Sequence, residues 1–144
     1  MAVLEGLKPE KVFEYFEKIC AIPHGSGNTK EISDMLCSFA KERGLWYYQD
    51  EVNNVIIKKD GSLGKENSAP VILQGHMDMV CEKAPDCTLN MEKEGLNLKT
   101  DGEIVFAEGT TLGADNGIAL AMIMAILDAD DIPHPPIEAV ITVD

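Results

Sequence analysis

A histidine and an aspartate, one residue apart, follow an apolar run in the segment 71–78, which reads VILQGHMD. Such a run is typical of a buried strand, and a strand delivers the residues at its end to the edge of a sheet. A neutral imidazole is a good zinc ligand, and a ligating histidine usually donates its other ring N–H to a carboxylate. His76 could therefore bind a metal ion while Asp78 orients its ring or ligates directly. The alternative is a surface turn in which the two residues occur by chance.

Asp115 is a second candidate, because it lies in a glycine-containing stretch at the start of an apolar segment. The simpler interpretation is that Asp115 caps the helix that follows. The functional interpretation is a carboxylate that bridges two metal ions, which must then lie roughly 3.5–4 Å apart. The N-terminus of a helix would help to keep this acid ionised.

Helices and strands alternate around these candidates. Apolar residues at helical spacing predict helices over residues 9–22, 28–43 and 116–127. Patterns typical of strands occur at residues 45–49, 55–57, 71–74, 103–107 and 137–143. The stretch 79–97 has weak periodicity and is left unassigned. The pattern predicts an α/β fold with a mixed, mostly parallel sheet flanked by helices, in which ligands gather at the carboxyl ends of the strands. His76 and Asp78 follow one such end, and Asp144 follows another.

Several local features complete this expectation. Asn28 with Glu31 is typical of a helix N-cap with its reciprocal partner, and Gly44 of a left-handed C-cap. The loop 23–27, which reads PHGSG, resembles neither a nucleophile elbow nor a phosphate-binding loop. His24 and His134 lie in proline-containing loops and are interpreted as loop residues rather than ligands. Core packing is the interpretation for four methionines, Met77, Met79, Met122 and Met124.

Composition narrows the class of protein. The 144 residues, 45% of them hydrophobic, correspond to about one domain with a real core. The net charge of −13 disfavours nucleic acids and anionic membrane surfaces as partners. Four cysteines without a C-x-x-C pair indicate reduced thiols, and hence a cytoplasmic protein. No signal peptide or membrane-spanning stretch is recognised.

Two long motifs carry a family resemblance. Residues 73–83, LQGHMDMVCEK, and 109–118, GTTLGADNGI, closely resemble the bacterial aminoacyl-histidine dipeptidases (Xaa-His dipeptidases, peptidase D). This branch belongs to a co-catalytic zinc family that also contains peptidase T, aminoacylases and acetylornithine deacetylase. The loop 23–28 and the segment 132–138 are similar to the same branch, so the resemblance covers essentially the whole chain.

The resemblance implies roles for three residues and a zinc-exopeptidase-like catalytic domain. His76 would be a ligand of one zinc ion, Asp78 would orient His76, and Asp115 would bridge two zinc ions or other divalent metals. In relatives the peptide bond after this bridging aspartate is often cis. A zinc-bound hydroxide would hydrolyse dipeptides of the Xaa-His type.

The resemblance also implies that part of the site is absent. Relatives carry an acidic pair just after the position of Asp144, in which one glutamate is the general base and the other a zinc ligand. Residues 1–144 are therefore expected to be the N-terminal part of a catalytic domain, inactive alone. The rest of that domain and any lid or dimerisation domain would lie outside these residues. The parent would be a homodimer that acts on small peptides, and the fragment is expected to self-associate.

Two other functions stay open. One is another zinc hydrolase of the same family, an aminoacylase, deacetylase or tripeptidase. The other is a non-catalytic α/β binding module that uses the same scaffold. The residues that follow Asp144 would separate an enzyme from a binding module, because only the enzyme needs the acidic pair.

Overall fold

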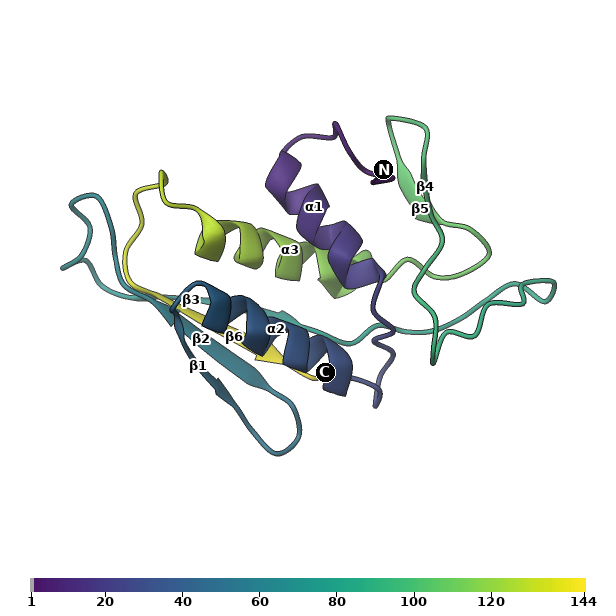
Figure 1. Cartoon of the computed structure of the whole chain (residues 1–144), viewed down its shortest axis with the longest axis horizontal. Coiled ribbons are helices and arrows are strands. Elements are labelled where there is room, and N and C mark those ends of the chain that lie inside the picture. Colours follow the sequence, from purple (N-terminus) through teal and green to yellow (C-terminus); the bar gives the residue numbers. More distant parts are fainter. Residues whose placement is uncertain (1) are drawn as a thin grey trace.

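A four-stranded sheet with helices on one face is the main feature of the computed structural model, which describes residues 2–144 (Figure 1). The helices are α1 (Glu10–Cys20), α2 (Lys30–Glu42) and α3 (Ala114–Asp128). The strands of this main sheet, in spatial order, are β1 (Trp46–Gln49), β2 (Val55–Lys59), β6 (Ile137–Thr142) and β3 (Val71–His76). A separate hairpin consists of β4 (Leu98–Thr100) and β5 (Val105–Ala107).

The pairing of the strands follows from their connections. A short turn joins β1 to β2, so these strands are antiparallel, and the Asp50 carboxylate fixes the turn by accepting hydrogen bonds from the amides of Val52 and Asn54. The strands β3 and β6 are parallel, and α3 lies in the long connection between them. The pairing of β2 with β6 is antiparallel. The predicted mixed α/β class is confirmed. The predicted predominance of parallel strands is not found in residues 2–144, where one pairing of three in the main sheet is parallel.

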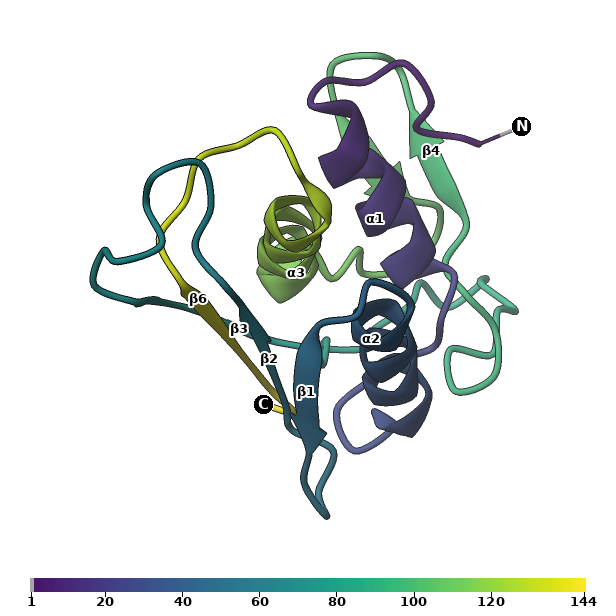
Figure 2. The same cartoon turned by 60° about the vertical axis from the view of Figure 1, so that its left-hand side comes forward.

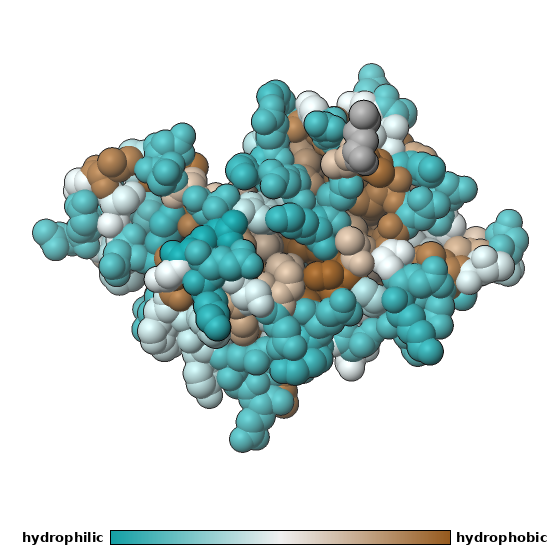
Figure 3. Space-filling model, viewed as in Figure 1, coloured by the Kyte–Doolittle hydropathy of each residue, from teal (hydrophilic) through white to brown (hydrophobic). Residues whose placement is uncertain are grey.

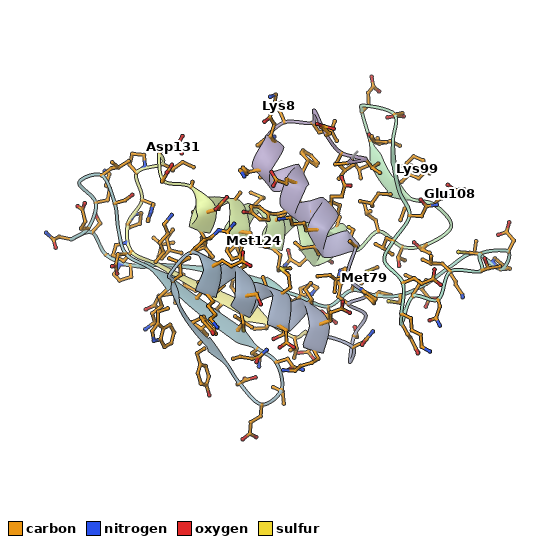
Figure 4. The ribbon with its side chains drawn as sticks, in the orientation of Figure 1. Lys8, Met79, Lys99, Glu108, Met124 and Asp131 are labelled. Atoms are coloured by element: carbon orange, nitrogen blue, oxygen red, sulfur yellow. The ribbon has the colours of Figure 1, made fainter. Side chains whose placement is uncertain are left out.

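The core lies between the helices and the inward face of the sheet. Alternate residues of the two central strands are fully buried, namely Val55, Ile57, Ala139 and Ile141. Figure 2 shows α1, α2 and α3 together on this side of the sheet. The helix α3 is apolar on nearly all sides, and its Met124, labelled in Figure 4, is 1% exposed. Each fully buried valine, isoleucine or methionine side chain contributes about 1.5–3 kcal/mol to folding, so this layer accounts for much of the stability.

The opposite face of the sheet is open. No helix among residues 2–144 covers it in Figure 2, and Trp46, Tyr48 and Ile72 are 54%, 54% and 63% exposed. The Nζ atom of Lys58 lies 4.8 Å from the centroid of the Trp46 ring. Figure 3 shows further hydrophobic surface between α1 and the β4–β5 hairpin. Apolar side chains are therefore exposed on two surfaces of the chain, and exposed apolar surface of this kind is typical of interaction sites.

The predicted elements are confirmed with local corrections. Gly44 has a φ of +68°, as the predicted left-handed cap requires. The predicted N-cap at Asn28 is wrong, because Thr29 precedes α2 and the Asn28 side chain donates to the carbonyl of Glu92 instead. Met122 is 51% exposed and is not a core residue, whereas the other three methionines are buried. Within the described chain no helix has the length and apolar character that crossing a membrane requires.

Candidate metal centre

The strand β3 brings His76 to the edge of the main sheet, beside the end of β6. His76 is in register with Thr142, and the Met77 amide donates a 2.7 Å hydrogen bond to the Thr142 carbonyl. Asp78 follows just beyond the strand. Ligands of open α/β sheets bind at the carboxyl ends of the strands, so both residues lie where a ligand would be expected.

His76 lies between two carboxylates. Its Nδ1 atom is 2.7 Å from Oδ1 of Asp78, and its Nε2 atom is 3.0 Å from Oδ1 of Asp115. Burial alone would lower the pKa of His76, but the hydrogen bonds to Asp115 and Asp78 outweigh it and raise that pKa above its ordinary value. If Nδ1 donates its proton to Asp78, then Nε2 and the Asp115 oxygen are two acceptors facing each other. A proton or a metal cation must lie between such a pair, because two lone pairs at this distance repel.

Asp115 reaches His76 because the start of α3 departs from helical geometry. Its φ and ψ of −93° and 101° are not helical, the Asp115–Asn116 peptide bond is cis, and the Asp115 side chain is 94% exposed. Gly113, just before, has a φ of +74°, and a Cβ atom there would lie 2.8 Å from Sδ of Met79. Glycine at position 113 therefore lets Met79 pack directly under the turn that carries Asp115. The cis bond is the one that the resemblance implies.

Backbone pairing joins the segment after β3 to the segment before α3. Lys83 and Thr110 form an antiparallel bridge, and the Thr111 amide donates to the Glu82 carbonyl at 2.9 Å. The Thr111 hydroxyl donates to the Val80 carbonyl at 2.7 Å. These contacts fix the distance between the two motifs directly. They explain how residues separated by 39 positions in the chain, His76 and Asp115, stay in contact.

The loop 23–28 also contacts the site, which the sequence did not predict. Ser26 Oγ donates a 2.5 Å hydrogen bond to Oδ2 of Asp78, and the Ser26 amide donates to the Met79 carbonyl at 3.1 Å. Figure 4 shows Met79 where the chain leaves the sheet, near the C-terminal end of α1. The sequence signals for this loop were its Gly-Ser-Gly pattern and its similarity to the dipeptidase branch, and neither indicated contact with Asp78.

The chemistry of His76 and Asp115 fits a zinc ion. Imidazole nitrogen and carboxylate oxygen are both zinc ligands, with bonds of about 2.0–2.2 Å, so two ligands of one tetrahedral ion lie roughly 3.3 Å apart. The observed 3.0 Å between Nε2 and Oδ1 is close to that separation. Residues 2–144 contain no group of three or more His, Cys, Asp or Glu side chains that could hold a metal ion. Two candidate ligands are fewer than the three protein ligands that a catalytic zinc site normally has.

The other two histidines lie in loops, as predicted. His24 and His134 are 3% and 5% exposed, and their Nδ1 atoms pair with the carbonyls of Ile22 and Pro135 at 2.6 and 2.7 Å. Burial lowers the pKa of His24. Neither ring hydrogen-bonds to the site carboxylates within the described residues. All four cysteines are free there.

Comparison with known proteins identifies relatives that are peptidases, although no family model matches the chain. The chain is 40% identical over 142 residues to the cytosol non-specific dipeptidase of Escherichia coli (strain K12). That alignment covers 99% of this chain and 29% of the relative. The structure superposes on the aminoacylhistidine dipeptidase of Vibrio alginolyticus with a TM-score of 0.94 and 40% identity, covering 98% of this chain and 29% of that one.

Two more distant structures share the fold. A tripeptidase from Staphylococcus aureus and an aminopeptidase from Bacillus cereus each give a TM-score of 0.73, at 24% and 22% identity. The two matches cover 92% and 93% of this chain, and each covers 36% of the neighbour's chain. The resemblance to aminoacyl-histidine dipeptidases that the two motifs indicate is confirmed. The chain spans about 29% of the length of the dipeptidases that it matches.

Proposed function

We propose that the complete protein is a zinc-dependent dipeptidase and that residues 1–144 form the N-terminal part of its catalytic domain. One observation carries the metal proposal: Nε2 of His76 and Oδ1 of Asp115 face each other at 3.0 Å, with Nδ1 of the same ring bound to Asp78. The dipeptidase relatives, at 40% identity, support peptide hydrolysis as the reaction.

Each residue of the site has a separate task in this proposal. His76 and Asp115 would hold zinc, and the exposed Asp115 carboxylate, which has an oxygen free of His76, would be available to a second ion. Asp78 holds the ring in the tautomer that leaves Nε2 unprotonated, and it stabilises the orientation of the ring. Bound zinc would supply Lewis acidity and lower the pKa of a coordinated water molecule.

The remaining ligands and the general base are proposed to lie outside residues 1–144. Asp78 is unsuited to be the base, because both of its carboxylate oxygens are already engaged, one by His76 and one by Ser26. The 144-residue chain by itself should therefore bind zinc weakly and hydrolyse nothing. The proton of the attacking water would pass to a carboxylate elsewhere in the complete protein.

The substrates are proposed to be dipeptides, including those with histidine at the C-terminal position. The two relatives differ on this point, because one is named a non-specific dipeptidase and the other an aminoacylhistidine dipeptidase. We also place the complete protein in the cytoplasm as a homodimer. The 144-residue chain alone should self-associate, because Trp46, Tyr48 and Ile72 are exposed on its open sheet face.

An assay of the complete protein against a panel of peptides tests this function. The panel contains dipeptides with and without C-terminal histidine, one tripeptide and one N-acetylated amino acid. Dipeptide hydrolysis should disappear in a chelator and return with added zinc. Hydrolysis that persists in the chelator would contradict metal dependence. A preference for the tripeptide or the acetylated substrate would replace dipeptidase by tripeptidase or deacetylase.

A further inference from the structure

We propose that Ser26 is a positioning residue of the metal centre, which fixes the Asp78 carboxylate and through it the ring of His76. This inference rests on the proposed zinc-dependent function. It also assigns a role to the loop 23–28, which the sequence left without one. Among the described residues, Ser26 hydrogen-bonds to Asp78 and not to His76 or Asp115, so its effect would pass through Asp78.

The geometry links Ser26 to Asp115 through three successive contacts. Ser26 Oγ donates to Oδ2 of Asp78 at 2.5 Å, and Oδ1 of the same carboxylate lies 2.7 Å from Nδ1 of His76. Nε2 of His76 then faces Asp115 at 3.0 Å. A carboxylate held at one oxygen can still rotate about its Cβ–Cγ bond, whereas one held at both oxygens cannot. Ser26 therefore restricts the orientation in which Asp78 meets the imidazole.

The Ser26 hydroxyl is itself held in place by the backbone. The Met79 amide donates to the His24 carbonyl at 3.0 Å, and the Ser26 amide donates to the Met79 carbonyl at 3.1 Å. Gly25 and Met79 form a parallel bridge between these two bonds. The loop thus runs as a short strand beside the segment that carries Asp78. A serine on such a strand needs little ordering of its own to reach the carboxylate.

The loop is also fixed on its other sides. A Cβ atom on Gly25 would lie 2.7 Å from Sγ of Cys81, so the loop packs closely against Cys81 at this glycine. The buried His24 ring pairs with the Ile22 carbonyl at 2.6 Å, and the Asn28 side chain donates to the Glu92 carbonyl at 3.1 Å. These contacts make the loop a rigid support. They would not be needed for a turn that only links α1 to α2.

The alternative is that the Ser26 hydroxyl only stabilises the loop. Loop stabilisation predicts a lower melting temperature for the metal-free protein and an unchanged affinity for zinc. Positioning predicts an unchanged melting temperature and a weaker affinity for zinc, because the polypeptide fold does not depend on this one exposed hydroxyl. Outer-shell partners of metal-bound histidine typically change metal affinity by 10- to 100-fold, and we expect about tenfold weaker zinc binding for Ser26→Ala.

The experiment measures the zinc dissociation constant and the metal-free melting temperature of the complete protein. Its variants are Ser26→Ala, Ser26→Thr and, as the matched control, Ser68→Ala. Ser68 lies in an exposed loop, and its hydroxyl makes no hydrogen bond among the described residues. We expect weaker zinc binding for Ser26→Ala at an unchanged melting temperature, recovery in Ser26→Thr, which keeps the hydroxyl, and no change in the control. Ser26→Ala with the wild-type zinc affinity would overturn the proposal, as would a loss that Ser26→Thr does not recover.

A double-mutant cycle tests whether Ser26 acts through Asp78. In an Asp78→Ala background, Ser26→Ala should weaken zinc binding no further. An additional loss of the full tenfold would refute action through Asp78. The wild-type protein separates this proposal from the one on which it rests: absence of zinc binding in the wild type would overturn both. Normal wild-type zinc binding with no effect of Ser26→Ala would overturn the positioning role alone.

Discussion

Replacing Gly113 by alanine should destabilise the turn that carries Asp115, for two reasons that can be measured separately. Gly113 has a φ of +74°, a conformation that costs a residue with a side chain about 1–2 kcal/mol. The new Cβ atom would also lie 2.8–3.1 Å from three atoms of Met79, which is 3% exposed and has little room to move. Overpacking of this kind costs about 1–3 kcal/mol, so the total loss should be about 2–5 kcal/mol.

Gly44 provides the matched control, because its φ is +68° and no atom lies within 4 Å of a Cβ built there. Gly44→Ala should therefore show the backbone cost alone. The measurement is the free energy of unfolding of each 144-residue variant from urea denaturation followed by circular dichroism. Gly113→Ala should be the less stable variant by about 1–3 kcal/mol. In a Met79→Ala background, which removes the crowded side chain, the two glycine substitutions should cost nearly the same. Equal losses at the two glycines in the wild-type background would refute the role assigned to Met79.

Two further predictions concern the network in which Asp128 of α3 accepts hydrogen bonds from Arg43 Nε at 2.7 Å and Tyr15 OH at 2.8 Å. Asp128→Asn should lower the free energy of unfolding by about 1–3 kcal/mol in urea denaturation. The control is Asp131→Asn, at an exposed loop residue labelled in Figure 4, which should leave the free energy of unfolding unchanged. Equal effects of the two substitutions would contradict the network. Burial, with the hydrogen bond to Asp128, raises the pKa of Tyr15 to about 12. The folded state then holds the Tyr15 proton more tightly than the unfolded state does. The contribution of this pKa shift to stability is therefore complete below pH ~10 and is lost as the pH rises toward ~12. The midpoint of urea unfolding should fall between these pH values in the wild type, and it should fall less in Tyr15→Phe. Parallel curves of midpoint against pH for the two proteins would contradict the raised pKa of Tyr15.

Local patterns in the sequence were sufficient for the part of the site that lies on regular elements. The β-branched run before His76 predicted β3, and alternation of strands and helices placed the end of that strand at a ligand-binding edge. The apolar segment after Asp115 likewise predicted α3. These inferences succeed because burial imposes a periodicity that can be counted along the chain.

The remaining contacts depend on residues far apart in the sequence. The stretch 79–97 has weak periodicity because much of its backbone pairing is with the segment 109–111 and the loop 23–28, and its internal bonds form only short turns. The expected cap at Asn28 failed for the same reason, since its side chain bonds to Glu92, 64 residues away. The contact of Ser26 with Asp78 spans 52 residues and has no local signature. Tertiary pairing of this kind is invisible to propensity and spacing.

The most direct test of the account is the position of zinc in crystals of the complete protein, located by anomalous diffraction at the zinc absorption edge. We predict a zinc ion bound to Nε2 of His76 and to the Asp115 carboxylate, with Nδ1 of His76 still paired with Asp78. A zinc ion bound elsewhere would contradict the assignment of this centre. So would zinc-saturated crystals in which no zinc ion lies between Nε2 of His76 and the Asp115 carboxylate.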